Sequence, residues 1–424
     1  MAAAGVARGV ALVGAEGRVT ALEARVDDQS RQTDHVDDDW RWRQARIRLR
    51  AAFDNSGLPW PAGSVSFEVR PASLPYGGVM SDLTVAAAVL SAAGCVPVEA
   101  AQATVFVGEL GLDGRLRPVR GVLPAVLAAK DSGAERVVVP AANLAETSQA
   151  HGVTVLGAAS LSEVVEFLRG DRHLPGPGSP QASSHPLYAA WSDLLIEHPA
   201  CRAVEVAAAG GHHLFLLGSP GAGTAFLAER LVELLPDLSE EAWLEVSCLQ
   251  SLAEILPAEA LPSRRPPFSA PHFSSTLAAM RGAGGRGAVR PGAVSLAHRG
   301  VLFVDDAPEF RRDVLDALRQ PLEHGELSIM HQRVLTRLPA YIQLVAAARP
   351  CPCGARRREE CACTRAQATR YLGRLAGPLM DRIDIRVDLD RPDASPQPAT
   401  PAASFADIAY RVAAAREAAA LRWG

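Results

Sequence analysis

The sequence contains no apolar run that approaches the roughly 18 residues of a membrane span. Its first residues, 1–14, also lack a basic region followed by a cleavable apolar core, so no leader peptide is expected. A strong charge is missing as well: the formal total is −4 at pH 7, which argues against a protein that coats nucleic acid by bulk electrostatics. These absences favour a cytoplasmic protein without a membrane partner.

Disulfides are not expected either, because the seven cysteines are an odd number and four of them crowd into one short stretch. With 48% hydrophobic and 21% charged residues, the chain has a globular composition, and leucine, valine and alanine dominate over aromatics, as α/β proteins allow. A length of 424 residues is too great for one ordinary core. Two domains are therefore expected.

The order of short β-like runs and helical stretches predicts where these domains lie. Residues 1–170 alternate strands such as Arg136–Val139 with alanine-rich helices such as Leu83–Ala93, which indicates an α/β domain. The Pro/Gly/Ser-rich stretch that follows cannot continue either element, so a linker is expected at 171–187.

The second domain is expected at 188–392, where apolar strands indicate a parallel sheet. Residues 311–322 indicate a helix between two of these strands. Residues 393–424 hold a linker rich in proline and alanine and one further helix at 405–423. The strands are expected at His212–Leu217, Gly300–Val304 and Ile342–Ala346.

The stretch GSPGAGTA has the outline of a phosphate-binding loop between a strand and a helix. Its glycines let successive backbone N–H groups turn inward, and the start of the helix favours anions. A lysine for the β- and γ-phosphates should stand where Thr224 is, and a hydroxyl for Mg²⁺ where Ala225 is. Because both are absent, a tight strand-to-helix connection is the alternative interpretation. The candidate nucleotide-binding residues are Gly218, Ser219, Pro220, Gly221, Ala222, Gly223, Thr224 and Ala225.

Two acids follow a strand in VLFVDDAPEF, at residues 301–310. Four apolar residues precede Asp305 and Asp306, so both carboxylates are expected at the carboxyl end of a strand, where open α/β sheets place their ligands. Asp305 is the candidate acid on the Mg²⁺ side. A helix cap is the other common role of such a pair.

CPCG followed by CAC brings four thiols into one loop in the pattern Cys-x-Cys, seven residues, Cys-x-Cys. Four thiols at this spacing are able to close a tetrahedral zinc site, and structural Zn²⁺ is favoured. Free thiols are the main alternative, and a disulfide pair in a reducing cytoplasm is a third. The candidate ligands are Cys351, Cys353, Cys361 and Cys363.

Two arginine-bearing segments are candidates for contact with DNA: MRGAGGRGAVR at 280–290, and residues 325–337, whose alternation suggests a hairpin. Arginines that bind phosphates position a strand without reading its sequence. Solvated arginines on loops are the alternative. The candidates are Arg281, Arg286, Arg290, Arg333 and Arg337.

Seven stretches together resemble the YifB/ComM group of Mg-chelatase-like AAA+ proteins, and the resemblance covers nearly the whole chain. It implies a Lon-protease-like α/β domain of the ribosomal S5 type, followed by a P-loop AAA+ parallel-sheet domain whose helical lid is truncated to one helix. It also implies a hexameric ATPase that uses ATP and Mg²⁺, and branch migration of DNA for the competence-linked members. The stretches are AAAGGHHLFLLGSPGAG, LSEEAWLEV, FSAPHFSS, RPGAVSLAHRGVLFVDDAPEF, VLDALRQPLEHGEL, PCPCG and GPLMDRID.

The resemblance also implies roles for single residues. Asp305 would be the Walker B aspartate, and Arg382 the arginine finger offered to a neighbouring subunit. Arg349 occupies a sensor position where the family has asparagine. Asp306 replaces a glutamate that orients the attacking water, and its carboxylate is withdrawn by about an ångström, which can cost on the order of a hundredfold in rate. Residues 194–197 replace a Val-x-Gly-Gln stretch beside the adenine.

These departures predict that ATP and Mg²⁺ binding is weak or lost and that hydrolysis is impaired. One hypothesis is an AAA+ motor that remodels DNA by ancestry. The alternative is a pseudo-ATPase scaffold, or a protein that binds DNA or a partner without turnover. A third hypothesis, a chelatase subunit that acts on a porphyrin, is supported only by similarity of fold.

Protease activity is not expected from the Lon-like domain. Ser81 lies near the nucleophile position, but Leu123 occupies the position of the lysine base, and Lys130 lies about two helical turns further on. Ser81 is therefore better explained as a helix cap.

Overall fold

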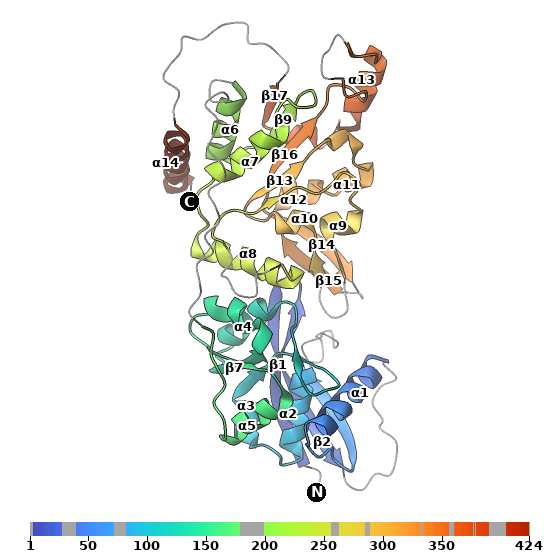
Figure 1. Ribbon diagram of the computed structural model, residues 1–424, viewed down its shortest axis with the longest axis vertical. Helices are drawn as coiled ribbons and strands as arrows, with labels where there is room; N and C mark the ends of the chain where they lie inside the picture. The colour runs from blue at the N-terminus through green and yellow to red at the C-terminus, as the bar shows by residue number, and fades with distance from the viewer. Residues whose placement is uncertain are drawn as a thin grey trace.

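The computed structural model consists of two α/β halves stacked along the long axis of the molecule, with the N-terminal half below in Figure 1. The predicted α/β class is confirmed, whereas the domain bounds stay a prediction. Within the described part of the chain, no helix combines the length and the apolar character that crossing a membrane requires. The structure describes residues 3–27, 40–71, 82–178, 199–255, 263–284, 289–331, 334–355, 360–375, 377, 379–389 and 404–423.

The N-terminal half is built on a mixed six-stranded sheet with the order β3-β2-β1-β4-β7-β8. The first three strands pair antiparallel, and the tight turn at Gly14, with φ of +69°, reverses the chain between β1 and β2. The other three run parallel to β1. The strands are β1 (Ala3–Val13), β2 (Glu16–Asp27), β3 (Ser64–Arg70), β4 (Thr104–Phe106), β7 (Arg136–Pro140) and β8 (Thr154–Ala158), with a separate hairpin of β5 (Glu109–Leu110) and β6 (Leu116–Arg117).

Small residues let α2 lie directly on this sheet. All of its residues are buried, and a β-carbon at Gly5 of β1 would collide with the backbone of α2 at Ala88 and Ala92. The predicted alanine-rich helix at 83–93 is confirmed by α2. The helices of this half are α1 (Trp40–Asn55), α2 (Asp82–Ala92), α3 (Val98–Gln102), α4 (Val122–Asp131), the 3₁₀ turns η2 (Ala141–Asn143) and η3 (Ala145–Gln149), and α5 (Leu161–Arg169).

The C-terminal half is built on a five-stranded sheet with the order β10-β13-β16-β9-β17, in which all neighbours are parallel. Its central strands are apolar apart from Gln343 at the start of β16, because apolar clusters pack on both faces. The three strands expected from the sequence are confirmed by β9, β13 and β16. The strands are β9 (Leu214–Leu217), β10 (Phe268–Ser269), β13 (Val301–Val304), β16 (Gln343–Ala348) and β17 (Ile385–Asp388).

The helix expected as one piece at 311–322 is wrong: the chain forms two short helices with a break at Ala317 and Leu318. Pro321 explains the break, since its ring clashes with the carbonyl four residues earlier, at Ala317. The helices here are α6 (Pro199–Gly210), α7 (Thr224–Leu234), α8 (Glu240–Ala253), α9 (Leu277–Arg281), α10 (Ala293–Leu296), η5 (Ala307–Glu309), α11 (Arg312–Asp316), α12 (Arg319–His324), α13 (Arg365–Leu372), η7 (Gly373–Leu375) and η8 (Met380–Arg382).

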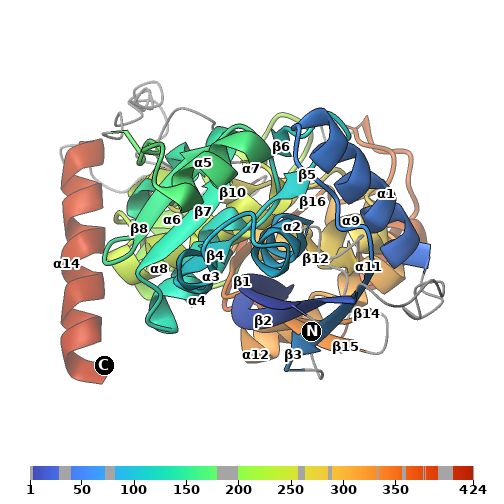
Figure 2. The ribbon, with the colours of Figure 1, turned by 90° about the horizontal axis from the view of Figure 1, so that it is seen from below.

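Two small hairpins and a last helix complete the C-terminal half. The hairpin expected at 325–337 is confirmed by β14 (Glu326–His331) and β15 (Val334–Pro339), and β11 (Gly282–Gly284) pairs with β12 (Val289–Pro291). The helix expected at 405–423 is α14 (Phe405–Trp423), which lies at the periphery in Figures 1 and 2. It packs on α6, where Arg411 Nε donates to Glu205 Oε1 at 2.7 Å.

Helix α8 joins the two halves, as Figure 1 shows. Cys248 and Leu252 are buried in a core cluster of the N-terminal half, together with residues of β1 and α4. Leu249, on another side of the helix, packs with Leu338 of β15 and with Ala15 of the turn between β1 and β2. Because α8 is apolar on several sides, it belongs to the interior of both halves at once.

A carboxylate is enclosed at this junction. Glu146 Oε2 accepts a hydrogen bond from Ser251 Oγ of α8 at 2.6 Å, and Oε1 accepts one from Asn143 Nδ2 at 2.6 Å. Burial raises the pKa of the Glu146 carboxyl, and these two hydrogen bonds only partly oppose the shift.

Replacing Glu146 with glutamine should therefore raise the thermal unfolding midpoint of the full chain at pH 7. A carboxyl whose pKa is raised in the folded state contributes most stability below its unfolded pKa of about 4.3, and that contribution is lost as pH rises through the folded pKa. The gain from Glu146→Gln should accordingly shrink to nothing near pH 4. Midpoints measured from pH 4 to 8 check this, with Glu135→Gln, at an exposed position, as the control. A lower midpoint for Glu146→Gln at pH 7 would contradict the assignment.

Candidate functional site

The predicted phosphate loop lies between β9 and α7, at the carboxyl edge of the C-terminal sheet. The backbone N of Gly218 donates to the carbonyl of Ala348, at the end of β16, at 3.1 Å, so the loop begins as a continuation of the sheet. A β-carbon at Gly218 would lie 2.9 Å from that of Ala222, which is why the loop tolerates only glycine at its start. Gly223 has φ of +89° and caps α7, whose first residue is Thr224.

The predicted acids occupy a tight turn directly after β13. Asp306 has φ of +47°, a left-handed conformation that is rare outside glycine, and its backbone N donates to Asp305 Oδ1 at 3.0 Å. Burial raises the pKa of the Asp305 carboxyl, which the hydrogen bond from Asp306 partly offsets. The 3₁₀ turn η5 then places Glu309 on the same side of the chain as Asp306.

Arg349, directly after β16, binds this acidic turn. Its Nε donates to Asp306 Oδ1 at 2.7 Å, and its Nη2 donates to Glu309 Oε1 at 3.0 Å. Since β16 lies between β13 and β9, the guanidinium stands between the acids and the phosphate loop. A β-carbon at Gly354 would lie 3.0 Å from Nη1 of Arg349 and 3.9 Å from Pro220 at the tip of that loop.

The sequence did not indicate three further members of this cluster. Glu309 is the second acid on Arg349, and Arg374 Nη1 lies 3.8 Å from Glu309 Oε2. The side chain of Tyr371 is buried beside them. Of the three, only Glu309 could have been predicted from the sequence, since it stands three residues after Asp306.

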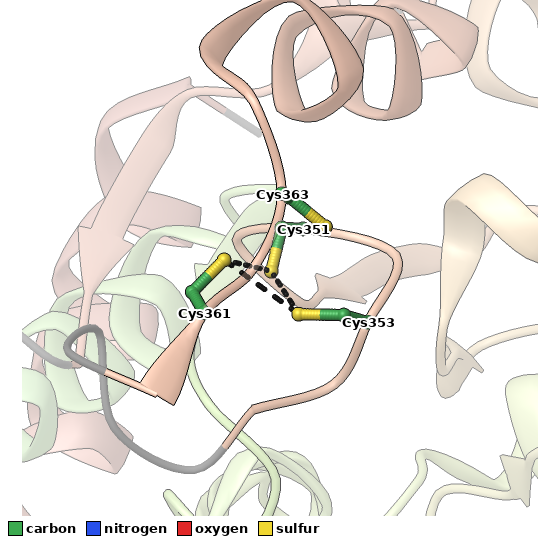
Figure 3. A group of neighbouring side chains, drawn as sticks. All are labelled: Cys351, Cys353, Cys361 and Cys363. Atoms are coloured by element: carbon green, nitrogen blue, oxygen red, sulfur yellow. Dashed lines mark hydrogen bonds between the residues drawn. The ribbon is translucent and has the colours of Figure 1, made fainter.

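The four predicted cysteine ligands converge in one loop that begins two residues after Arg349 (Figure 3). Their sulfur atoms all lie within 4.8 Å of one another. The sulfur of Cys351 lies 3.2 Å from that of Cys353 and 3.3 Å from that of Cys361, and the last two are 3.6 Å apart. A hydrogen bond from the backbone of Ala355 contributes most to lowering the pKa of the Cys353 thiol to about 6.

This arrangement fits a zinc ion. Four thiolates at a Zn–S distance of about 2.3 Å in a tetrahedron lie about 3.8 Å from each other, which is near the spacing of the sulfurs here. Tetrathiolate sites of this kind serve structure, because all four positions around the metal are filled by the protein. Cys351, Cys353, Cys361 and Cys363 would hold the ion.

Comparison with known proteins places the whole chain in one family. A family model described as magnesium chelatase, subunit ChlI, matches residues 191–396, and one described as subunit ChlI of Mg-chelatase matches residues 38–143. An uncharacterized protein of Mycobacterium tuberculosis is 45% identical over 99% of this chain and 84% of its own length. YifB of Escherichia coli, also uncharacterized, is 39% identical over 88% of this chain and 74% of its own, and the competence protein ComM of Haemophilus influenzae is 37% identical over 82% and 68%.

The chain belongs to the YifB/ComM group of Mg-chelatase-like proteins. For the N-terminal half, a match to Lon protease 2 of Bacillus subtilis is 31% identical over 97 residues, which are 23% of this chain and 17% of that protein. A Lon-like α/β half followed by an AAA+ half agrees with the two sheets described above.

The remaining candidate residues of this Mg-chelatase-like chain lie apart from the acids. Arg382 Nη2 donates to Glu323 Oε1 of α12 at 2.9 Å. Arg281, the last residue of α9, donates from Nη2 to the carbonyl of Ser328 in β14 at 2.7 Å, and its contact with DNA stays a prediction. The others that the structure describes, Arg290 and Arg337, are exposed on β12 and β15. Ser81, residues 194–197, Arg286 and Arg333 lie outside the described residues.

If the cysteine loop holds zinc, purified protein should contain about one zinc ion per chain. Cys353→Ser should lose that metal and lower the unfolding midpoint of the protein, by about 2–4 °C for each kcal/mol of lost stability. Elemental analysis and thermal unfolding with and without a chelator measure both effects. Cys95→Ser, which changes a free cysteine of the N-terminal half, should leave the metal content unchanged. Equal metal content in the two variants would sink the assignment.

Proposed function

We propose that this chain is an Mg-chelatase-like AAA+ protein that binds the phosphates of ATP weakly and hydrolyses it slowly or not at all, and so acts as a scaffold for DNA or a protein partner. The observation that carries the proposal is the residue at the start of α7. Thr224 stands there, and the only lysine of the chain is Lys130, in α4 of the N-terminal half. No lysine side chain of this chain is therefore available to the phosphate loop.

The size of the loss supports weak binding. An ammonium about 4 Å from a phosphate charge contributes on the order of 4 kcal/mol at an effective dielectric of 20, which corresponds to roughly a thousandfold in affinity. The backbone N–H groups of the loop and the start of α7 remain as an anion cradle. A nucleotide held only by this cradle exchanges rapidly.

The catalytic side supports slow turnover. Asp306 is shorter than glutamate, and its carboxylate is bonded to Arg349 instead of being open to a water molecule. Ala225 offers no hydroxyl to a metal ion. Three positions that the family resemblance assigns to the nucleotide site therefore differ from the family pattern at this edge of the sheet: Asp306 replaces glutamate, Arg349 replaces asparagine, and Ala225 replaces a residue with a hydroxyl.

Restoring the missing groups should restore affinity. The unmodified protein should bind a fluorescent ATP analogue weakly, and Thr224→Lys with Ala225→Thr should tighten binding by up to about a thousandfold. Thr224→Met with Ala225→Thr has nearly the same side-chain length without the charge and should not tighten it. Phosphate release, measured with and without branched DNA, should equal that of Asp305→Asn. Faster release by the unmodified protein would contradict the proposal.

DNA binding is a second candidate function, favoured by the pairing of the two arginine-bearing hairpins. Hairpin strand β11 lies next to β14, and Arg281, the last residue of α9 directly before β11, donates to the carbonyl of Ser328 in β14. We infer that Arg290, exposed on β12, and Arg337, exposed on β15 and 3.6 Å from Glu326, form one surface. The relative named a competence protein, ComM, supports this reading. We include in the proposal a cytoplasmic homo-oligomer, a hexamer, in which Arg382 faces a neighbouring subunit.

Removing these arginines should weaken DNA binding in a salt-dependent way. Each lost phosphate contact lowers the slope of log affinity against log salt concentration by about one. Arg290→Ala with Arg337→Ala should therefore reduce the slope by about two, measured by fluorescence anisotropy on duplex DNA at several salt concentrations. Arg312→Ala removes an arginine that is 90% exposed on α11 and should change nothing. Equal slopes for all three proteins would argue against this surface.

A further inference from the structure

The acidic turn after β13 already has a cation bound to it, and that cation is a side chain of this protein. Arg349 Nε donates to Asp306 at 2.7 Å, and Nη2 donates to Glu309 at 3.0 Å. The exposed fractions of these three side chains are 25%, 35% and 30%, so solvent screens the two bonds less than it screens an ion pair on the open surface. Two of the three carboxylates at this edge are therefore occupied.

Residues of α13 and η7 close the cluster on another side. The Tyr371 side chain is buried, and its hydroxyl faces the charges of Arg349 and Glu309. Arg374 Nη1 donates to the carbonyl of Pro308, inside the acidic turn, at 3.0 Å. These contacts hold the turn against the guanidinium and limit the access of water to it.

The residues at this edge do not fit a magnesium ion. Mg²⁺ requires a near-octahedral shell of oxygen ligands and is usually held by carboxylates together with phosphate and water oxygens. Residue 225 is alanine, and oxygens of Asp306 and Glu309 are bonded to the guanidinium. Of the three acids, only Asp305 has no ion-pair partner within the residues that the structure describes. One free carboxylate beside a fixed positive charge is a poor site for a divalent cation.

We propose that Arg349 is the built-in counter-ion of the acidic turn, that it takes the place of a divalent cation, and that this chain therefore binds nucleotide phosphates without Mg²⁺. A guanidinium remains charged at any pH that the protein tolerates, so the pairing does not open by deprotonation. The claim that nucleotide phosphates bind without Mg²⁺ rests on the proposed function. The claim that Arg349 excludes a divalent cation does not depend on nucleotide binding and is tested separately.

The first experiment measures Mn²⁺ binding to the nucleotide-free protein by electron paramagnetic resonance, with Mn²⁺ as a probe for a divalent cation. Arg349→Asn removes the charge and frees both carboxylates, so it should bind Mn²⁺ at least about tenfold more tightly than the unmodified protein at this site. Adding Asp305→Asn to that variant should abolish the gained site, which locates it at the acidic turn.

Arg374→Ala is the matched control, because it removes an equal charge near Glu309 without freeing Asp306. It should gain little Mn²⁺ affinity. Arg349→Lys keeps the charge and should still exclude Mn²⁺, which provides a second readout if Arg349→Asn does not fold. A folded Arg349→Asn without a gained site, or an unmodified protein that already loses Mn²⁺ affinity on Asp305→Asn, would overturn the proposal.

The second experiment compares the affinity of the unmodified protein for the ATP analogue in excess Mg²⁺ and in a chelator. The two values should agree within about twofold, whereas a magnesium-dependent site gains about tenfold or more from the metal. A large gain from Mg²⁺ would overturn this inference and leave the weak, non-hydrolysing site intact. Rapid phosphate release would instead overturn the proposed function, and the Mn²⁺ result would still stand or fall by itself.

Discussion

The parallel alignment of β13, β16 and β9 is the constraint on which the candidate site depends. Neighbouring strands lie about 4.8 Å apart, so the residues that follow three adjacent strands meet within about 10 Å at one edge. Because β16 is the middle strand, the side chain that follows it lies between the acids after β13 and the loop after β9. Position 349 is therefore placed next to both.

The balance of charge at this edge explains why the substitutions occur together. Three carboxylates stand on one short turn, and burial already raises the pKa of one of them, Asp305. Without a lysine in the phosphate loop and without a bound metal, an uncharged residue at 349 would leave Asp305 and Asp306 without a compensating charge, which is costly in a partly buried site. On our proposal, Arg349 compensates for the loss at Thr224 by neutralising the acids, although it does not replace the contact that a lysine makes with phosphate.

Much of this arrangement was predictable from the sequence, because strands and loops that bind phosphate have local patterns. The apolar run before Asp305 and the glycines before Thr224 fixed the ends of β13 and β9. The partners of Arg349 were harder to predict from the sequence. Tyr371 and Arg374 reach the cluster only through the packing of α13 and η7, which no local pattern encodes.

The interior role of α8 was not predictable for a related reason. Its apolar residues do not form a single stripe along the helix, so their periodicity does not predict which half each of them packs against. Leu252 belongs to the core of the N-terminal half, and Leu249 to a cluster with β15. The break between α11 and α12, by contrast, could have been predicted from Pro321. The helix expected at 311–322 was wrong because it continued through the residues before this proline.

The cysteine loop approaches the phosphate loop at Gly354. This residue follows Cys353 with φ of +63°, and a β-carbon on it would touch both Nη1 of Arg349 and Pro220. The loop that would hold zinc therefore passes close to the guanidinium and to the tip of the phosphate loop. Because a tetrahedral metal fixes the positions of all four sulfurs, zinc at this site would also fix Gly354 and hence limit the movement of Arg349 away from the acids. On our proposal the structural metal and the built-in counter-ion then support each other, since the cysteine loop begins at Cys351, two residues after Arg349.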